Sequence, residues 1–376
     1  MGTRRAERLR ELGQSVWLDF IRRGQLISGE FERTVREDGV VGVTSNPTIF
    51  QLAISQSSDY DVAIQNGITA GLEGPALFES LAIEDIRLAC DRLRATYASS
   101  AGLDGRVSLE VSPHLAHDTS GTVAEARRLY CEVDRENVMI KVPATPEGLP
   151  AITSLTAEGL SINVTLIFSL ARHAEVMEAY LAGLEHRQSE GKELKHIRSV
   201  ASFFVSRVDT KVDAAIEAAL PRWTGADRET LAAARGKAAI ANARLAYARF
   251  RDTFGRPRFL ALAAKGAHVQ RPLWASTSTK NPAYRDVLYV EELIGSDTVN
   301  TMPPQTLAAF NDHGVVEARI GHDLDQAHAL FETLPRLGIP LEELISQLEP
   351  EGVATFAKSY DTLLDALAAK RREMAA

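Results

Sequence analysis

The chain has 376 residues, a formal charge of −8 at pH 7 and 45% hydrophobic residues. This length allows two average domains or one large barrel, and it is sufficient to bury a substantial core. The negative charge argues against nonspecific nucleic-acid binding. No apolar run approaches the ~20 residues of a membrane helix, and the charged segment 1–10 precedes no apolar core. The sequence therefore predicts a cytoplasmic protein that binds neither membrane nor nucleic acid.

The cysteines and histidines that could bind a metal lack the required spacing. Cys90 and Cys131 lie in helix-like segments, and neither has a C-x-x-C partner or a nearby histidine pair. His114 and His117 do not match H-E-x-x-H, and Pro113 places them in a loop. We therefore predict no metal site and no disulfide, and we interpret the two histidines as solvated loop residues.

In chain order, the hydrophobic pattern alternates between short apolar runs and helical segments. A short amphipathic helix is expected over 5–13, and apolar residues at helical spacing predict a helix over 170–184. The expected strands cover 15–20, 39–47, 106–113, 137–143, 160–168, 197–205, 269–276 and 297–303. An alanine-rich helix is expected over 228–250. The chain after Pro303 reads as helical throughout, including 351–372.

Short strands that alternate with helices favour a parallel sheet, and eight such units favour closure into a (β/α)₈ barrel. An open doubly wound sheet is the alternative. That fold is expected to have a G-x-G-x-x-G or G-x-x-x-x-G-K-[ST] turn, and neither occurs. The sequence thus predicts an α/β protein in which residues 1–376 form a single TIM-barrel domain with additional helices and a helical C-terminal extension.

One lysine, Lys141, lies inside the apolar run 137–143, two residues before the proline that ends the expected strand. Burial disfavours the ammonium form and can lower a lysine pKa by several units, which makes the amine nucleophilic. A lysine near a strand end can instead extend to solvent or pair with a carboxylate. Taken alone, this segment supports the two interpretations about equally.

Polar residues recur where other expected strands end, and in barrels of this kind the active site lies at those ends. Each residue alone has a structural explanation as a turn cap, a strand former or a small packing residue. As a set that converges on one barrel mouth, they predict a functional site. A buried lysine with two carboxylates nearby is what Schiff-base aldol chemistry requires. The set consists of Asp19, Asn46, Glu110, Lys141, Asn163, Thr165, Ser202 and Ser276.

Three segments resemble motifs of the transaldolase family. Residues 44–49, T-S-N-P-T-I, resemble the T-[ST]-N-P motif after its second strand, and residues 139–145, M-I-K-V-P-A-T, resemble the motif around its Schiff-base lysine. Residues 162–169, I-N-V-T-L-I-F-S, are similar to a further strand of the family. The order and spacing of the motifs agree, and the resemblance extends over most of the chain.

This resemblance implies transfer of a dihydroxyacetone unit from a ketose phosphate, fructose 6-phosphate or sedoheptulose 7-phosphate, to an aldose phosphate. The acceptor would be glyceraldehyde 3-phosphate or erythrose 4-phosphate, in the non-oxidative pentose phosphate pathway. The resemblance implies that Lys141 forms an iminium with the donor ketone. The iminium serves as the electron sink, so neither a metal nor another cofactor is expected. Sugar phosphates are the expected partners, and the oligomeric state is left open.

The resemblance also implies roles for the other residues. Glu110, with Thr165, would handle the water and protons of iminium formation. Asp19 would take or return the hydroxyl proton as the carbon–carbon bond breaks. The hydroxyls of the bound three-carbon fragment would be held by Asn46, Asn163 and Ser202.

The expected phosphate site departs from the family pattern. Relatives often have an arginine two residues after the serine that ends the seventh strand, Ser276, where this chain has Ser278. Lys280 is expected to supply the missing charge, and Arg207 matches the family's other phosphate arginine. The substrate-binding set therefore also includes Ser276, Arg207 and Lys280.

Two other functions are alternatives. A simple aldolase in the same fold would release free dihydroxyacetone, and the sequence does not separate it from a transaldolase. A non-catalytic barrel scaffold would be expected to have lost a catalytic residue, and none is lost.

Overall fold

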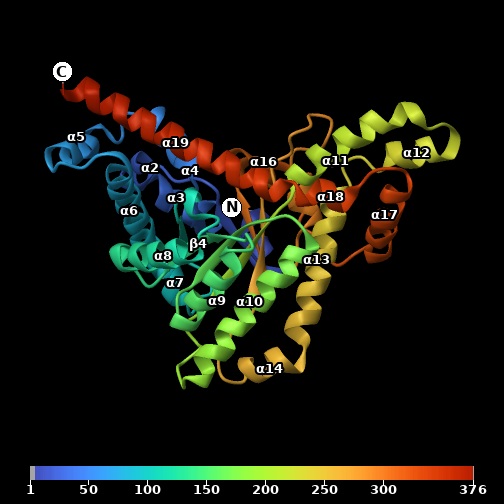
Figure 1. The fold of residues 1–376 in the computed structure, drawn as a ribbon, viewed down its shortest axis with the longest axis horizontal. Helices are drawn as coiled ribbons and strands as arrows, with labels where there is room; N and C mark the ends of the chain where they lie inside the picture. Colours follow the sequence, from blue (N-terminus) through green and yellow to red (C-terminus); the bar gives the residue numbers. More distant parts are fainter. Residues whose placement is uncertain (1–4, 376) are drawn as a thin grey trace.

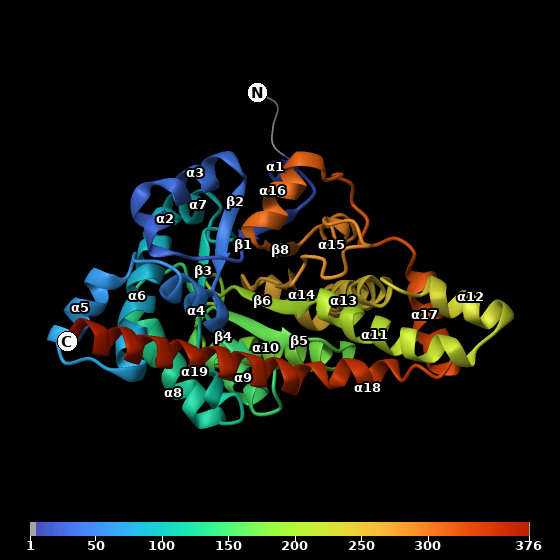
Figure 2. The same cartoon turned by 90° about the horizontal axis from the view of Figure 1, so that it is seen from above.

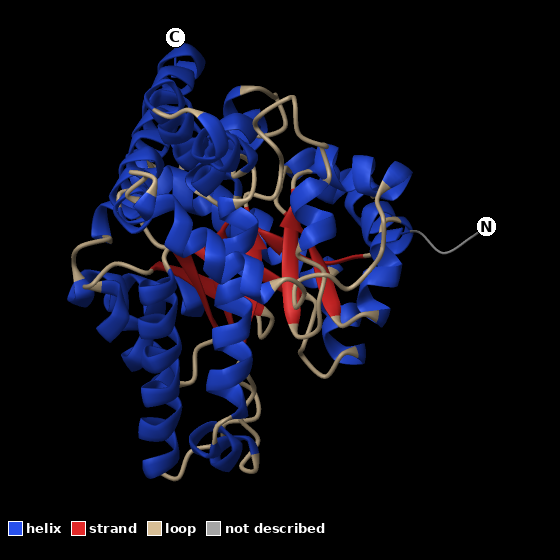
Figure 3. Ribbon diagram, turned by 90° about the vertical axis from the view of Figure 1, so that its right-hand side faces the viewer, coloured by secondary structure: helices blue, strands red, loops and turns tan. Residues whose placement is uncertain are grey.

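The computed structural model describes residues 5–375, and its centre is a closed barrel of eight parallel strands. The strand order follows the chain from β1 to β8, and β1 pairs with β8 to close the barrel. Figure 1 shows helices around the barrel, and Figure 3 shows the strands enclosed by them. The predicted (β/α)₈ fold is confirmed. The strands are β1 (Gln14–Leu18), β2 (Val40–Thr44), β3 (Arg106–Glu110), β4 (Val138–Pro143), β5 (Ile162–Ile167), β6 (Ser199–Phe204), β7 (Gln270–Ala275) and β8 (Thr298–Met302).

The helices range from single turns to the 28-residue α19. None of those in residues 5–375 is long and apolar enough to cross a membrane. They are α1 (Arg5–Glu11), α2 (Arg23–Ser28), α3 (Glu30–Glu37), α4 (Pro47–Ser55), α5 (Asp61–Thr69), α6 (Gly74–Arg92), α7 (Arg94–Ser99), α8 (Thr119–Val133), α9 (Gly148–Glu158), α10 (Leu170–Ser189), α11 (Ser206–Ala219), α12 (Gly225–Ala233), α13 (Ala238–Gly255), α14 (Pro257–Ala263), α15 (Leu288–Glu292), α16 (Pro304–His313), α17 (Leu324–Arg336), α18 (Leu341–Ser346) and α19 (Leu348–Ala375), with 3₁₀ turns η1 (Pro113–Leu115) and η2 (Leu220–Arg222).

The strands are covered on both faces, because the barrel interior is packed and the helices lie outside. Every strand residue except Glu110 is buried. This explains why the strands read as nearly continuous apolar runs in the sequence. Inside the barrel, Trp17 lies against Gly42, where a Cβ atom would come within 2.5 Å of the indole nitrogen. Residues from α1 to α19 share one large hydrophobic core. This core is compatible with one domain, and the single-domain organisation stays a prediction.

Two predictions about helices are wrong. The alanine-rich segment 228–250 is not one helix, because α12 ends at Ala233 and α13 begins at Ala238. Gly236 lies between them with φ of +69°, a left-handed conformation that interrupts a right-handed helix, and a Cβ there would collide with Tyr284. The chain after Pro303 is also not helical throughout, because residues 314–323 form an irregular segment. That segment connects α16 to α17.

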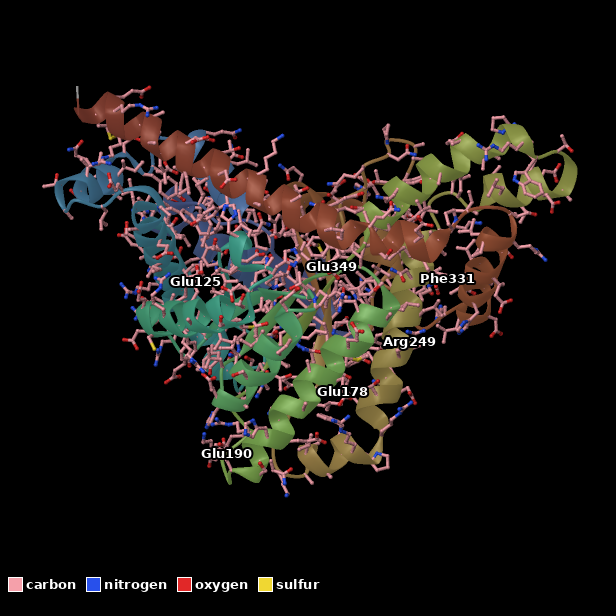
Figure 4. The ribbon with its side chains drawn as sticks, in the orientation of Figure 1. Glu125, Glu178, Glu190, Arg249, Phe331 and Glu349 are labelled. Carbon is pink, nitrogen blue, oxygen red and sulfur yellow. The ribbon has the colours of Figure 1, made fainter. Side chains whose placement is uncertain are left out.

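The C-terminal helix α19 crosses the barrel at the carboxyl ends of the strands (Figure 2), and it contains the predicted helix 351–372. It packs against α4, which follows β2, and against η1, which follows β3. Glu349, labelled in Figure 4, pairs with Arg172 of α10 at 2.9 Å. Gly352 lies close to Leu166, because a Cβ there would be 3.0 Å from the leucine side chain. Helix α19 therefore covers part of the predicted active-site end.

The two loop histidines are exposed, as predicted, and each faces one carboxylate. His114 Nε2 is 2.8 Å from Asp361 of α19, and His117 Nδ1 is 3.1 Å from Glu147. The side chains of His114 and His117 are 52% and 63% exposed. Both contacts are therefore surface pairs, of the kind that contributes little to stability.

Asp209 of α11 is a buried carboxyl that joins three helices. It accepts hydrogen bonds from the Ala239 backbone amide of α13 at 2.7 Å and from the Tyr289 hydroxyl of α15 at 2.8 Å. Burial raises the pKa of Asp209 to about 7. Between its unfolded value, near ~4, and 7, the folded protein binds this proton more tightly than the unfolded chain does. Its contribution to stability therefore falls as the pH rises through this window.

We expect Asp209→Asn to weaken the dependence of stability on pH. Between about pH 5 and pH 8 the wild type should lose roughly 2–3 kcal/mol more of its free energy of unfolding than the variant does, since one pKa unit corresponds to ~1.4 kcal/mol. Urea denaturation of both proteins at the two pH values measures this difference. Equal losses in the two proteins would contradict the prediction.

Candidate active site

The centre of the site is a buried ion pair between two neighbouring strands. Lys141 of β4 lies opposite Glu110 of β3 in the sheet register. The Lys141 Nζ is 3.0 Å from Glu110 Oε2 and donates a hydrogen bond to the Ser45 carbonyl oxygen at 2.9 Å. The side chains of Lys141 and Glu110 are only 5% and 6% exposed. Two features that the sequence offered as alternatives, burial of the lysine and pairing with a carboxylate, therefore occur together.

Two carboxyl groups near the lysine have raised pKa values. Burial raises the pKa of Glu110, the charge of Lys141 opposes this effect, and Asp19 raises the pKa further. Burial also raises the pKa of Asp19, against the hydrogen bond from Thr44 and the charge of Lys141. A carboxyl group with a raised pKa exchanges protons more readily at working pH than an ordinary one does. The site therefore holds one amine and two groups suited to acid–base chemistry.

Asp19 directly follows β1 and is held by two other strands of the barrel. Its Oδ1 accepts a hydrogen bond from Thr44 Oγ1 of β2 at 2.7 Å. The same hydroxyl of Thr44 lies 2.7 Å from Thr301 Oγ1 of β8. The carboxyl group and Lys141 influence each other electrostatically. These contacts fix Asp19 at the mouth of the barrel, as expected for a group that serves the same site as the lysine.

Asn163 and Ser202, which the sequence grouped as substrate-binding residues, are in direct contact. Asn163 of β5 lies opposite Lys141 in the sheet register. Its Nδ2 donates to Ser108 Oγ at 3.0 Å, and its Oδ1 accepts from Ser202 Oγ at 2.7 Å. Two residues farther along β5, Thr165 Oγ1 is buried without a hydrogen-bond partner among the described residues. An unpaired buried hydroxyl is suited to a water or a substrate group.

Asn46 has a structural role that the sequence also allowed. It is the N-cap of α4, and its side chain accepts a hydrogen bond from the Ile49 backbone amide at 2.9 Å. Pro47 follows at the first helical position, where its missing N–H costs nothing. Asn46 is the neighbour of Ser45, whose carbonyl oxygen binds the lysine. The capping bond therefore fixes the Asn46 side chain at the start of α4, and its contact with substrate stays a prediction.

The two predicted phosphate-binding cations lie at the same end of the barrel. Arg207 is the second residue of α11, and its guanidinium lies 5.7 Å from the centre of the Phe204 ring. The Lys280 Nζ donates to Ser278 Oγ at 2.7 Å. Burial lowers the pKa of both cations, and for Lys280 the charge of Arg207 lowers it further while Asp19 opposes. The two cations are therefore close enough to repel each other, and a dianion between them would relieve that repulsion.

Ser276, directly after β7, has a strained backbone. Its φ is +57°, in the left-handed region that costs energy for a residue with a side chain. Its Oγ lies 2.9 Å from Ser206 Oγ, and its carbonyl oxygen accepts a hydrogen bond from the Ser206 amide at 3.1 Å. Ser206 immediately precedes Arg207. The strain at Ser276 is therefore maintained where the end of β7 meets the start of the helix that bears Arg207.

Three residues outside the predicted set contact its members. Thr44 binds Asp19, the Ser45 carbonyl oxygen binds Lys141, and Ser108 binds Asn163. Thr44 and Ser45 belong to the segment T-S-N-P, but a backbone acceptor leaves no signal in the sequence. Ser108 lies two residues before Glu110 on one strand. Because strand side chains alternate, this spacing puts Ser108 and Glu110 on the same face of β3. The spacing alone was therefore sufficient to predict that Ser108 lies in the site.

Comparison with known proteins agrees with this geometry. The model of the Transaldolase/Fructose-6-phosphate aldolase family matches residues 16–367. A transaldolase from Mycolicibacterium smegmatis is 50% identical over 355 residues, which cover 94% of each chain. A transaldolase from Thermobifida fusca is 49% identical over 364 residues, 96% of this chain and 97% of the relative. A Nostoc protein named transaldolase 2 is 47% identical over 368 residues, 96% of each chain. The resemblance inferred from the three sequence motifs is thus confirmed, and the chain belongs to the transaldolase/fructose-6-phosphate aldolase family.

Proposed function

We propose that this protein is a transaldolase that transfers a dihydroxyacetone unit between sugar phosphates through a Schiff base on Lys141. The donor is fructose 6-phosphate or sedoheptulose 7-phosphate, and the acceptor is glyceraldehyde 3-phosphate or erythrose 4-phosphate, as in the pentose phosphate pathway. The observation that carries this proposal is the buried pair of Lys141 and Glu110. The name transaldolase of the relatives supports it. We further propose a cytoplasmic protein that does not bind nucleic acid.

The first half of the proposed reaction uses Lys141, Glu110 and Thr165. Glu110 accepts a proton from the Lys141 ammonium, 3.0 Å away, and the free amine attacks the donor ketone to give a carbinolamine. Glu110 then returns a proton to the departing hydroxyl, so that water leaves and the iminium forms. The Thr165 hydroxyl, which lacks a partner among the described residues, holds this water. Hydrolysis reverses these steps at the end of the cycle.

Asp19 serves the carbon–carbon step. Its carboxylate takes the proton from the substrate hydroxyl next to the breaking bond, and the bonding electrons move to the iminium to give an enamine. The first aldose phosphate then leaves. The enamine attacks the acceptor aldehyde, and Asp19 returns the proton to the new hydroxyl. Asn46, Asn163 and Ser202 hold the hydroxyls of the three-carbon fragment, and the register of Asn163 opposite Lys141 supports this role.

Borohydride reduction in the presence of fructose 6-phosphate, followed by mass spectrometry, tests the proposal. We expect a reduced three-carbon adduct on Lys141, because the enamine and iminium of dihydroxyacetone persist when no acceptor is present. An adduct on another lysine, or none, would contradict the Schiff-base assignment. Measuring free dihydroxyacetone without an acceptor separates the two activities of the family. Release at a rate comparable with transfer would favour the aldolase alternative.

Arg207 and Lys280 are the proposed phosphate anchors. Arginine can grip phosphate through two parallel hydrogen bonds, whereas lysine acts as a point charge, so Arg207 is the stronger anchor. We expect Arg207→Ala to lower kcat/KM for fructose 6-phosphate. The decrease should correspond to a loss of roughly 2–4 kcal/mol of transition-state stabilisation, the range for a lost charge-assisted contact and an unpaired phosphate. Lys280→Ala should cost less. Neither substitution should change the rate with unphosphorylated fructose.

A compensating substitution provides the matched control. The family resemblance implies an arginine where this chain has Ser278, and Ser278 contacts Lys280 at 2.7 Å. Ser278→Arg added to Lys280→Ala should therefore restore most of the lost kcat/KM for fructose 6-phosphate. Steady-state kinetics with the phosphorylated and unphosphorylated sugars measure all of these effects. If Arg207→Ala slows both substrates equally, Arg207 has a structural role and phosphate binds elsewhere.

A further inference from the structure

A cavity of about 270 Å³ lies at the opposite end of the barrel from the active site. Its lining comes from the amino-terminal ends of strands, including Arg106, the first residue of β3, and Arg271, the second residue of β7. Arg198, which directly precedes β6, also lines it. Met139 lines it on β4, two residues or ~7 Å before Lys141. The cavity and the active site are thus separate spaces inside one barrel.

Three arginines at this cavity are nearly buried, and few carboxylates compensate their charge. The exposed fractions of Arg106, Arg198 and Arg271 are 1%, 9% and 6%. Arg271 lies 3.4 Å from Asp104. Within residues 5–375, neither of the other two arginines pairs with a carboxylate. The rim residue Asp297 pairs with a different arginine, outside the cavity lining, at 3.3 Å.

The hydrogen bonds of these arginines go mainly to neutral acceptors. Arg198 donates to the carbonyl oxygens of Lys195 at 2.7 Å and Ala101 at 3.0 Å. Its Nε is buried without a hydrogen-bond partner among the described residues. Arg106 donates to the Gly102 carbonyl oxygen at 2.9 Å and to a serine hydroxyl. Carbonyl oxygens orient a guanidinium but leave its positive charge uncompensated.

The electrostatics of the cavity reflect this excess of positive charge. Burial lowers the pKa of Arg106 to about 10, and the charges of Arg198 and Arg271 lower it further. Burial also lowers the pKa of His268, another lining residue, and Arg198 and Arg106 add to this effect. Burying a cation is unfavourable unless an anion compensates its charge. The cavity therefore has an excess of positive charge in a protein of net charge −8, because Asp104 and Asp297 supply two negative charges against three arginines.

We propose that this cavity binds a small phosphate-bearing anion, either inorganic phosphate or the phosphate group of a short monoester. Guanidinium groups match the tetrahedral oxygens of phosphate and remain charged at any physiological pH. A volume of about 270 Å³ accommodates a phosphate with a few carbon atoms, but it is small for a drug-sized ligand. The bound anion would offset the mutual repulsion of Arg106, Arg198 and Arg271.

Binding of inorganic phosphate, followed by ³¹P NMR at constant ionic strength in chloride, tests this proposal. The full chain with Arg207→Ala and Lys280→Ala is the background, because these changes remove the proposed phosphate anchors of the active site. We expect this protein to retain one saturable phosphate site. Adding Arg198→Met should weaken the site by roughly tenfold to a hundredfold, the range for a lost hydrogen bond to a charged group. Absence of saturable binding in the background protein would overturn the proposal.

A second pair of variants avoids the structural role of the arginines. Leu103 lines the cavity and is 43% exposed, whereas Leu260 on α14 is 53% exposed and does not line it. Leu103→Glu places a carboxylate at the rim and should weaken phosphate binding by roughly tenfold, and Leu260→Glu should leave it unchanged. This comparison is made in the same background, with Arg207→Ala and Lys280→Ala, so that phosphate bound at the active site does not contribute. If the two variants bind phosphate with equal affinity, the arginines have only a structural role in the loops that they contact. That result would overturn the proposal.

Glycerol 1-phosphate is a short phosphate monoester, so comparing its affinity with that of inorganic phosphate distinguishes the two sources of the phosphate group. It lacks a carbonyl that could react with Lys141. Tighter binding than inorganic phosphate, sensitive to Leu103→Glu, would assign the cavity to a phosphate monoester. Tighter binding of inorganic phosphate would assign it to the free anion. Both outcomes support the proposed chemistry, whereas failure of both compounds to bind contradicts it.

Discussion

Replacing Lys141 with alanine is expected to abolish turnover together with the adduct trapped by borohydride. The amine is the nucleophile of the proposed reaction, so its removal leaves the donor ketone without the group proposed to form the iminium. The loss should therefore appear in the chemical steps and exceed that of any acid–base variant, for which factors of roughly 10²–10⁴ are usual. Trapping with fructose 6-phosphate, followed by mass spectrometry of the intact protein, measures the adduct. An adduct formed by the alanine variant would contradict the assignment.

Lys141→Ala is also expected to change the dependence of stability on pH. Lys141→Ala leaves the buried Glu110 carboxyl without the cation that lies 3.0 Å away in the wild type. Burial raises the pKa of Glu110, and the loss of Lys141 removes a charge that opposes this rise. The folded variant therefore favours the protonated carboxyl more than the unfolded chain does, and its stability falls as the pH rises. We expect the variant to be less stable relative to the wild type at about pH 8 than at about pH 5.

A double variant separates the chemical from the structural effect. Lys141→Met combined with Glu110→Gln removes both charges and preserves the approximate side-chain volumes, and replacement of a buried pair by neutral groups is often nearly neutral for stability. Thermal denaturation should show that this protein keeps a melting temperature closer to that of the wild type than Lys141→Ala does. It should nevertheless form no adduct. A double variant that is inactive only because it is unfolded would show no cooperative transition.

The sequence was sufficient for the fold and for the central lysine because these depend on local patterns. All eight strands lie within the predicted runs or within one residue of them, since burial on both faces makes each strand apolar along its length. Against such a background an ionisable residue is conspicuous, and this is why Lys141 and Glu110 could be identified. Pro143, the last residue of β4, marks the end of its strand in the sequence and in the structure.

Contacts between residues far apart in the chain could not be predicted. The hydrogen bond from Lys141 to the Ser45 carbonyl oxygen spans 96 residues and depends on barrel closure. The helix break at Gly236 was missed because alanine content favours a helix, whereas the left-handed backbone at one glycine interrupts it. The cavity lined by Arg106 and Arg198 was missed for a related reason. The starts of strands look like ordinary solvent-facing positions until the barrel brings them together.

The two carboxyl groups are expected to fail at different steps when each is replaced by its amide. Glu110 lies 3.0 Å from the lysine amine, so Glu110→Gln should slow formation of the iminium and trap the adduct slowly. Asp19, held by Thr44 at the barrel mouth, is the proposed base for carbon–carbon cleavage. Asp19→Asn should therefore form the iminium but break the carbon–carbon bond slowly. The trapped adduct of Asp19→Asn should then contain the intact six-carbon sugar phosphate, whereas that of the wild type contains three carbons. Each variant should lose roughly 10²–10⁴-fold in turnover.

Thr44 provides a control that keeps the carboxyl of Asp19 and changes only its environment. The hydrogen bond from Thr44 lowers the pKa of Asp19 against the effect of burial, because it stabilises the charged form. Thr44→Val removes that bond, so the pKa of Asp19 should rise further. Since carbon–carbon cleavage requires the carboxylate, the acid limb of the profile of kcat/KM against pH should move to higher pH.

Quenched-flow trapping of the two amide variants and pH profiles of Thr44→Val measure these effects. Adducts of equal mass and equal rate of formation in Glu110→Gln and Asp19→Asn would contradict the division of roles, and an unmoved acid limb in Thr44→Val would show that Asp19 is not the base.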